Sequence, residues 1–169
     1  MKKTFLMIVA FVTTMASALA NDGGLSDYKI RNWTATQEFK SISVSGDVSI
    51  VLMEETSSVL SVQGKQKFVD AVKMEIKNGV LHVSGKRGPW KNKTVVYIPV
   101  QHLKLLTVKG NSEVVSMGLL NSPSLHVRIE GSCTVSVKNR GLVTVDNDDY
   151  HTFSFDKNEK IKVLTGGSL

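Results

Sequence analysis

A cluster of cations surrounds one tryptophan near the middle of the chain, in the segment 86–93, beside a turn-forming Gly-Pro pair. Five side chains carry the chemistry of this segment: Lys86, Arg87, Trp90, Lys91 and Lys93. An indole ring stacks on the apolar face of a sugar, and cations bind anionic glycans or lipid headgroups. The segment is therefore the candidate ligand-binding site. An insertion loop whose tryptophan packs onto the fold is the alternative interpretation.

The densest group of carboxylates is Asp146, Asp148 and Asp149. Calcium takes six to eight oxygen ligands, often from closely spaced carboxylates. The chain lacks the Gly-Gly-x-Gly-x-Asp repeat that binds calcium in β-helical proteins. These residues are a secondary calcium candidate, and a solvated acidic end of the fold is the alternative. We expect no cofactor.

No set of residues has the spacing that catalysis requires. The four histidines do not cluster, and no Gly-x-Ser-x-Gly elbow is present. Glu54 and Glu55 are adjacent, so on a strand they face opposite sides and cannot act as an acid–base couple. The sequence therefore predicts a protein that is not an enzyme.

The N-terminus has the pattern of a signal peptide. Lys2 and Lys3 precede a short apolar run, and Ala18-Leu19-Ala20 is a small-x-small cleavage site. We predict cleavage after Ala20 and export to the periplasm, the cell surface or the medium, with no transmembrane segment in the mature product. The net charge of the whole chain is +6. Removal of two lysines lowers it to +4, an ordinary charge for a soluble protein that gives no indication of a nucleic-acid partner.

A single cysteine, Cys133, is present in the chain. An exported chain with one cysteine cannot form an internal disulfide, so its fold does not depend on one. We expect Cys133 to be a small buried packing residue, and an intermolecular disulfide is the alternative.

One pattern, apolar-x-apolar-x-Gly, recurs along the chain. Its copies lie at 42–46, 60–64, 81–85, 106–110 and 127–131, and a sixth copy at 143–147 ends in asparagine. Alternating apolar residues turn one face of a strand inward, and glycine allows the chain to turn with a positive φ. Spacings of about 20 residues are typical of stacked repeats. The sequence predicts an all-β protein, a right-handed β-helix or β-solenoid with rungs of about 20 residues.

The segment 72–85 departs from this repeat, because Asn78-Gly79 between two alternating runs predicts a local antiparallel hairpin. The predicted organisation is a signal peptide at 1–20, a flexible segment at 21–38, a solenoid domain at 39–149 and a C-terminal cap or tail at 150–169.

The stretch from Phe39 to Ile50 after the signal peptide resembles the opening of the head GIN domain family of auto-transporter adhesins. Three later stretches, 60–64, 72–83 and 96–114, are similar to the same family. The resemblance implies a right-handed β-helix-like fold at the cell envelope, without known catalytic residues to transfer.

These observations give one leading hypothesis about function and two alternatives. The leading hypothesis is an exported, non-enzymatic adhesin or binding module that presents a rigid face and the 86–93 segment to a glycan or an envelope protein. The first alternative is a periplasmic structural or assembly partner that acts through its strand edges. The second is a polysaccharide-active enzyme on a β-helix, which requires carboxylates aligned across its coils.

Overall fold

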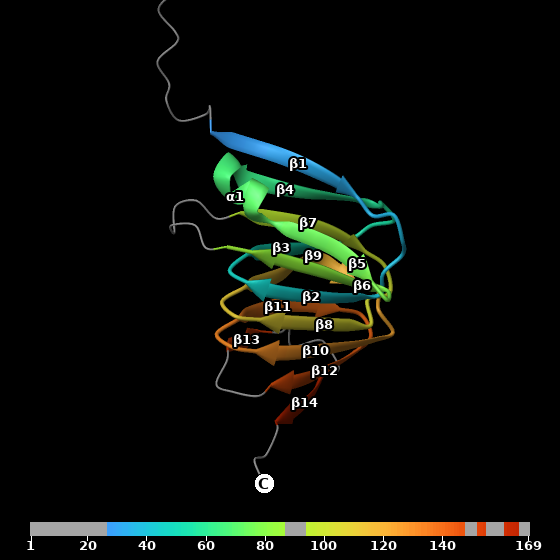
Figure 1. The fold of residues 1–169 in the computed structure, drawn as a ribbon. Helices are drawn as coiled ribbons and strands as arrows, with labels where there is room; N and C mark the ends of the chain where they lie inside the picture. Colours follow the sequence, from blue (N-terminus) through green and yellow to red (C-terminus); the bar gives the residue numbers. More distant parts are fainter. Residues whose placement is uncertain (1–26, 87–93, 148–151, 155–160, 166–169) are drawn as a thin grey trace, which may run out of the picture.

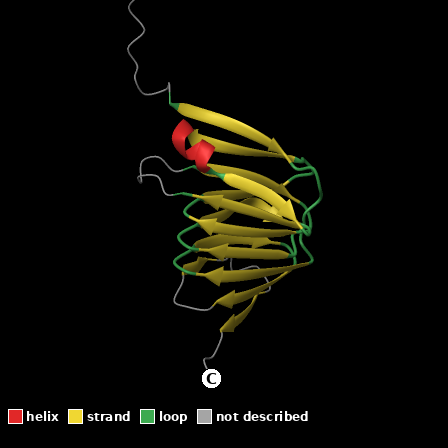
Figure 2. Ribbon diagram, viewed as in Figure 1, coloured by secondary structure: helices red, strands yellow, loops and turns green. Residues whose placement is uncertain are grey.

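The computed structural model describes residues 27–86, 94–147, 152–154 and 161–165, and these residues form strands and one short helix (Figures 1 and 2). The first seven strands are β1 (Tyr28–Thr34), β2 (Ser41–Gly46), β3 (Ser49–Glu54), β4 (Val59–Lys65), β5 (Lys73–Lys77), β6 (Val80–Gly85) and β7 (Val95–Val100). The next seven are β8 (Leu105–Lys109), β9 (Glu113–Leu120), β10 (Ser124–Glu130), β11 (Thr134–Asn139), β12 (Leu142–Asn147), β13 (Thr152–Ser154) and β14 (Ile161–Thr165). Helix α1 (Gln66–Ala71) lies between β4 and β5.

The strands form two sheets that face each other. The strand order is β1-β4-β7-β3-β9-β11-β13 in sheet A and β14-β12-β10-β8-β2-β6-β5 in sheet B. From β7 to β13 and from β14 to β6 neighbouring strands are parallel. The β1–β4, β4–β7 and β5–β6 pairs are antiparallel. Both sheets are therefore mixed, and their antiparallel strands lie at one end of the molecule (Figure 1).

This topology corrects the prediction of a right-handed β-helix or β-solenoid with rungs of about 20 residues. In a solenoid each coil lies beside the next coil in the chain. Here β2 lies between β6 and β8, and β3 lies between β7 and β9, so early strands occupy the middle of both sheets. The sequence repeat requires only strands with alternating apolar residues and a turn at the end of each strand. Two mixed sheets meet this requirement as well as a solenoid does.

The antiparallel pair β5–β6 joins at Asn78 and Gly79, whose φ angles are 51° and 73°. Two successive positive φ angles define the hairpin turn that Asn-Gly favours, because its twist matches that of the strands. Residues 28–34, part of the segment expected to be flexible, instead form β1, which pairs along its whole length with β4. Within 150–169, residues 152–154 and 161–165 are strands β13 and β14.

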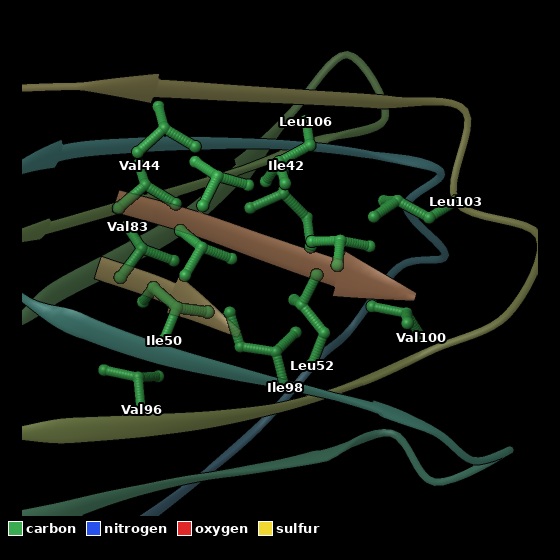
Figure 3. Close-up of a cluster of buried hydrophobic side chains, with 14 of the residues drawn as sticks. Ile42, Val44, Ile50, Leu52, Val83, Val96, Ile98, Val100, Leu103 and Leu106 are labelled. Carbon is green, nitrogen blue, oxygen red and sulfur yellow. The ribbon is translucent and has the colours of Figure 1, made fainter. Parts of the chain in front are cut away.

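The core lies between the sheets and consists almost entirely of Ile, Val and Leu. The inward residues of neighbouring strands form rows, as for Ile42, Leu81 and Leu106 in sheet B, each at most 1% exposed. Ile50 and Leu52 from sheet A meet this layer from the other side (Figure 3). A pleated strand turns alternate residues to opposite faces, so the apolar-x-apolar pattern is sufficient to build this core.

The glycines that end β6 and β2 and that directly follow β8 and β10 stack at one corner. A Cβ on Gly46 (φ +89°) would collide with the carbonyl oxygen of Gly85, and a Cβ on Gly110 (φ +84°) would lie 2.7 Å from the carbonyl oxygen of Gly46. Gly131 approaches the backbone of Gly110 in the same way. The repeated glycine is required both for its φ angle and for the close approach of neighbouring backbones.

Candidate functional site

The cationic segment predicted to bind a ligand lies almost wholly outside the described residues. Lys86 is exposed directly after β6, whereas Arg87, Trp90, Lys91 and Lys93 fall in the part of the chain that the structure does not describe. Their role in ligand binding remains a prediction.

The candidate calcium ligands are described only at Asp146. Its Oδ2 lies 3.3 Å from Nε of Arg128 and 4.0 Å from Nε2 of His126, on the outer face of sheet B. Asp148 and Asp149 lie outside the described residues. Within the described parts of the chain, no group of three or more His, Cys, Asp or Glu side chains is arranged to hold a metal ion.

Cys133 is buried, as the sequence predicted for a packing residue. Its Sγ donates to the carbonyl oxygens of Gly110 (3.3 Å) and Val108 (3.5 Å). Burial raises the pKa of the thiol above its ordinary value, so the reactive thiolate is disfavoured. The geometry suits packing and opposes nucleophilic chemistry.

A pocket of about 500 Å³ opens at the edge of the sheets where β1, β3 and β7 of sheet A end. At this edge the chain continues from β1 and β7 to sheet B, and from β3 to β4 within sheet A. Three connections form its walls: residues 35–40 between β1 and β2, residues 55–58 between β3 and β4, and residues 99–102 at the end of β7 (Figure 1). Pockets of this size hold small organic ligands.

Backbone hydrogen bonds hold these connections together. The amide N–H of Ala35 donates to the carbonyl oxygen of Ser58 at 2.8 Å, joining the first wall to the second. The carbonyl oxygen of Lys40 accepts from the N–H of Lys104 at 2.7 Å, which ties the first wall to the turn that follows the third. The pocket is therefore built on a hydrogen-bonded frame, and little ordering is required of it when a ligand binds.

His102 has a positive φ of 50°, which is uncommon for residues other than glycine. Its Nδ1 lies 3.1 Å from the carbonyl oxygen of Asn121. Because a carbonyl oxygen only accepts, Nδ1 carries the proton in this hydrogen bond. Backbone strain concentrates at functional sites, and this strained residue lines the pocket.

The pocket combines apolar and hydrogen-bonding groups. Its apolar lining is Ala35, Phe39, Pro99 and Val100. Its polar lining is Thr36, Gln37, Glu38, Lys40, Glu55, Thr56, Ser57, Ser58, Gln101 and His102. Amides, hydroxyls and carboxylates together with one aromatic ring are suited to a ligand with many hydroxyl groups and apolar C–H faces, such as a sugar.

No local sequence pattern indicates this pocket. The three segments that form its walls are distant from one another in the chain and share no motif. The sequence around His102 indicates an ordinary solvated histidine in a loop. Only the pairing of β3 with β7 brings residues 55–58 beside residues 99–102. None of the helices in the described residues is long and apolar enough to span a membrane.

A family model described as "Putative auto-transporter adhesin, head GIN domain" matches residues 38–147. The match covers the described core of both sheets except β1 and the last two strands. The resemblance noted on residues 39–50 and the three later stretches is thereby confirmed. Among curated proteins, none matches this chain.

Solved structures that match this chain include three proteins from Parabacteroides species. A putative lipid binding protein from Parabacteroides distasonis has a TM-score of 0.56 at 14% identity, over 83% of this chain and 67% of that one. A putative adhesin from the same organism has a TM-score of 0.49 at 13% identity, over 82% and 75%. A putative adhesin from Parabacteroides merdae has a TM-score of 0.46 at 10% identity, over 83% and 98%.

Proposed function

This chain belongs to the head GIN domain family of auto-transporter adhesins, and we propose that it is an exported, non-enzymatic adhesin that binds a glycan. The observation that carries this proposal is the pocket formed by residues 35–40, 55–58 and 99–102. The family supports a binding role, and the lining of the pocket supports a saccharide as the ligand.

Three properties of the pocket support saccharide binding. Its volume of about 500 Å³ suits one or two sugar rings. Its hydrogen-bonding groups come from several residue types, so they can both donate to and accept from hydroxyls. Its apolar lining, which includes Phe39, supplies surface for the C–H face of a ring.

The cationic segment 86–93 is a second candidate contact for the same ligand class. It connects β6 of sheet B to β7 of sheet A, whereas the pocket lies at the connection that leaves β7. Because the segment precedes β7 in the chain and the pocket lies where β7 ends, substitutions in each can be tested separately.

Binding of the mature protein, residues 21–169, to an array of bacterial and host glycans tests the proposal. His102→Gly removes the imidazole together with its hydrogen bond to Asn121 and accommodates the positive φ, so the fold should be retained while binding falls. Gln101→Ala is a second pocket variant, Trp90→Ala tests the cationic segment, and Thr107→Ala on the outer face of sheet B is the matched control.

The expected result is loss of at least tenfold in affinity for His102→Gly, with Thr107→Ala unchanged. Retention of full affinity in both pocket variants, with loss in Trp90→Ala, would move the site to the 86–93 segment. If the wild-type protein bound no glycan, the saccharide proposal would be wrong and an envelope protein would be the partner to seek by crosslinking.

Export is the second element of the proposal. The charged start, apolar run and Ala18-Leu19-Ala20 site support cleavage after Ala20 and release into the periplasm or onto the cell surface. Mass spectrometry of the protein from cell-envelope fractions should give a chain that begins at Asn21. Recovery of an intact Met1 in the cytoplasmic fraction would contradict export.

The open strand edges favour a second candidate function. Within the described residues, β1 and β5 each pair with one neighbouring strand only. An edge strand can add a strand from another protein. An assembly partner in the envelope would bind there, and proline substitution at an outward N–H of β1 would abolish its capture without affecting glycan binding.

A further inference from the structure

The outer face of sheet A carries a contiguous group of apolar side chains, here called the sheet A patch. It consists of Val51 and Met53 on β3, Val95 and Tyr97 on β7, and Val115 and Met117 on β9. Val51 lies in register with Tyr97 on one side and Val115 on the other, and Met53 lies beside Met117. The patch therefore spans three adjacent strands without interruption.

All six residues of the patch remain accessible to solvent, and Met117 is 64% exposed. The neighbouring strands extend the low-charge surface, because β4 presents Ser61 beside Tyr97 and β11 presents Ser136 beside Val115. Charged outward residues lie at strand ends, namely Lys65, Glu113 and Lys138. A contiguous apolar surface with a polar border is typical of a binding interface.

We propose that the sheet A patch binds a second copy of this chain, face to face, in a reversible dimer. This inference goes beyond glycan binding and does not depend on it. A two-fold axis along the row Tyr97–Val51–Val115 brings that row onto its own copy, so apolar side chains meet apolar side chains. Two sheet faces packed in this way lie about 10 Å apart, with their side chains interdigitated.

The charges at the border favour the same arrangement. The two-fold axis reverses the strand direction between copies, so the strand starts of one copy face the strand ends of the other. Glu113 lies at the start of β9, and Lys138 lies near the end of the adjacent strand β11. The carboxylate of Glu113, which accepts from Oγ of Ser49 at 3.3 Å in its own chain, thus lies at the same border as Lys138 of the other copy, and no like charges oppose each other within the patch.

A mixed border argues for a second copy over a lipid surface. Surfaces that bind anionic membranes present cations around an apolar centre. Here a carboxylate interrupts the border, and the apolar residues lie flat on strands, which insert poorly into a bilayer. A partner with the same mixed border is therefore the better complement.

The size of the surface sets the expected strength of the dimer. The three strands of the patch together with the neighbouring strands β4 and β11, at about 4.8 Å spacing and about 16 Å of strand length, give a footprint of roughly 400 Å². A standard interface buries about 800 Å² per partner. We therefore expect a dimer with a dissociation constant in the micromolar range or weaker, visible only at high protein concentration.

Sedimentation equilibrium of the mature protein from about 10 μM to 1 mM tests the proposal. The weight-average mass should rise toward twice the monomer mass, and Val51→Lys should raise the dissociation constant at least tenfold. Thr107→Lys is the matched control, because it introduces the same charge at the central row of sheet B and should dimerise as the wild type does. Met117→Lys, at an exposed position, covers the case in which Val51→Lys is poorly folded.

Two outcomes would overturn the proposal. One is a wild-type protein that remains monomeric at 1 mM. The other is unchanged dimerisation in both Val51→Lys and Met117→Lys. Flotation with vesicles of phosphatidylglycerol and phosphatidylethanolamine tests the lipid alternative. If the wild-type protein is monomeric and binds the vesicles, and Val51→Lys does not bind them, the occupant of the patch is a lipid surface.

Discussion

The outer faces of the two sheets differ in chemistry, although their inner faces are alike. Inward positions on both sheets carry Ile, Val and Leu. On the outside, the central row of sheet A reads Tyr97, Val51 and Val115. The corresponding row of sheet B is mainly polar, with Ser43, Thr107 and Arg128 on β2, β8 and β10. The inner faces specify the fold, and the outer faces are available to specify what each sheet contacts.

Ion pairs across neighbouring strands mark the outer face of sheet B as a solvent-facing surface. Nζ of Lys109 lies 2.7 Å from Oε2 of Glu130, and Arg128 pairs with Asp146. Such pairs are satisfied in water and contribute little to stability. On the outer face of sheet A, the three strands of the patch present apolar side chains at the equivalent positions. The difference teaches that the same alternating pattern can produce a solvated face or a contact face, depending only on its outward residues.

The largest effect is expected at the glycine corner where the strands of sheet B end. Gly46→Ala introduces a Cβ at φ +89° that collides with Gly85. The φ angle costs about 1–2 kcal/mol, and the overlap adds about 1–3 kcal/mol. Thermal unfolding should show a loss of about 3 kcal/mol, a decrease in Tm of roughly 10 °C.

Gly118→Ala separates the two contributions to this loss. Gly118 has a φ of +92°, but a Cβ there would meet nothing within 4 Å. Its expected cost is the φ term alone, about 1–2 kcal/mol. Equal losses in the Gly46 and Gly118 variants would mean that close packing of the corner contributes nothing.

An effect of the same size is expected at one of two adjacent residues that lie on opposite faces of β8. Leu106 is fully buried, so Leu106→Ala should cost about 2–5 kcal/mol in urea unfolding. Thr107 points outward, so Thr107→Ala should change the free energy of unfolding by less than about 0.5 kcal/mol. Similar losses at both positions would show that the outer face of sheet B is packed against something and is not solvated.

The smallest effect is expected on the polar face itself. Arg128→Ala breaks the pair with Asp146, whose atoms lie 3.3 Å apart, and should cost no more than about 1 kcal/mol at low salt. At 1 M NaCl the difference should vanish, because exposed charges are screened. Arg140→Ala is the control, since it removes the same charge from a side chain without an ion pair in the described residues. A loss that persists at 1 M salt would contradict this interpretation.

The local features of the fold were predictable from the sequence because they depend on neighbouring residues. Alternation at 42–44 and 106–108 gave the inward residues, and Asn78-Gly79 gave the hairpin turn. Cys133 was correctly expected in the core. In each case a pleat or a turn constrains residues only a few positions apart.

The arrangement of the strands was not predictable in the same way. The alternation of apolar and polar residues is the same whether β2 pairs with β8 or with a strand next to it in the chain. The repeat therefore could not indicate which strands pair, and the prediction of stacked coils was wrong. Strand β1 was missed because Lys29 and Arg31 occupy its partly buried face, where the sequence pattern expects apolar residues. Lys29 instead pairs with Asp70 at 2.8 Å, and Arg31 donates to the carbonyl oxygen of Val72 at 2.7 Å.

The position of β3 between β7 and β9 has a consequence for the order of folding. Its partner residues on β9 lie 64 positions further along the chain, as for Met53 and Met117. Closing loops of this length carries an entropic cost, and folds dominated by such contacts form slowly. During synthesis the N-terminus emerges first, so one edge of β3 stays unpaired until β9 has also emerged. The nascent protein therefore carries an incompletely paired central strand until residues 113–117 have emerged.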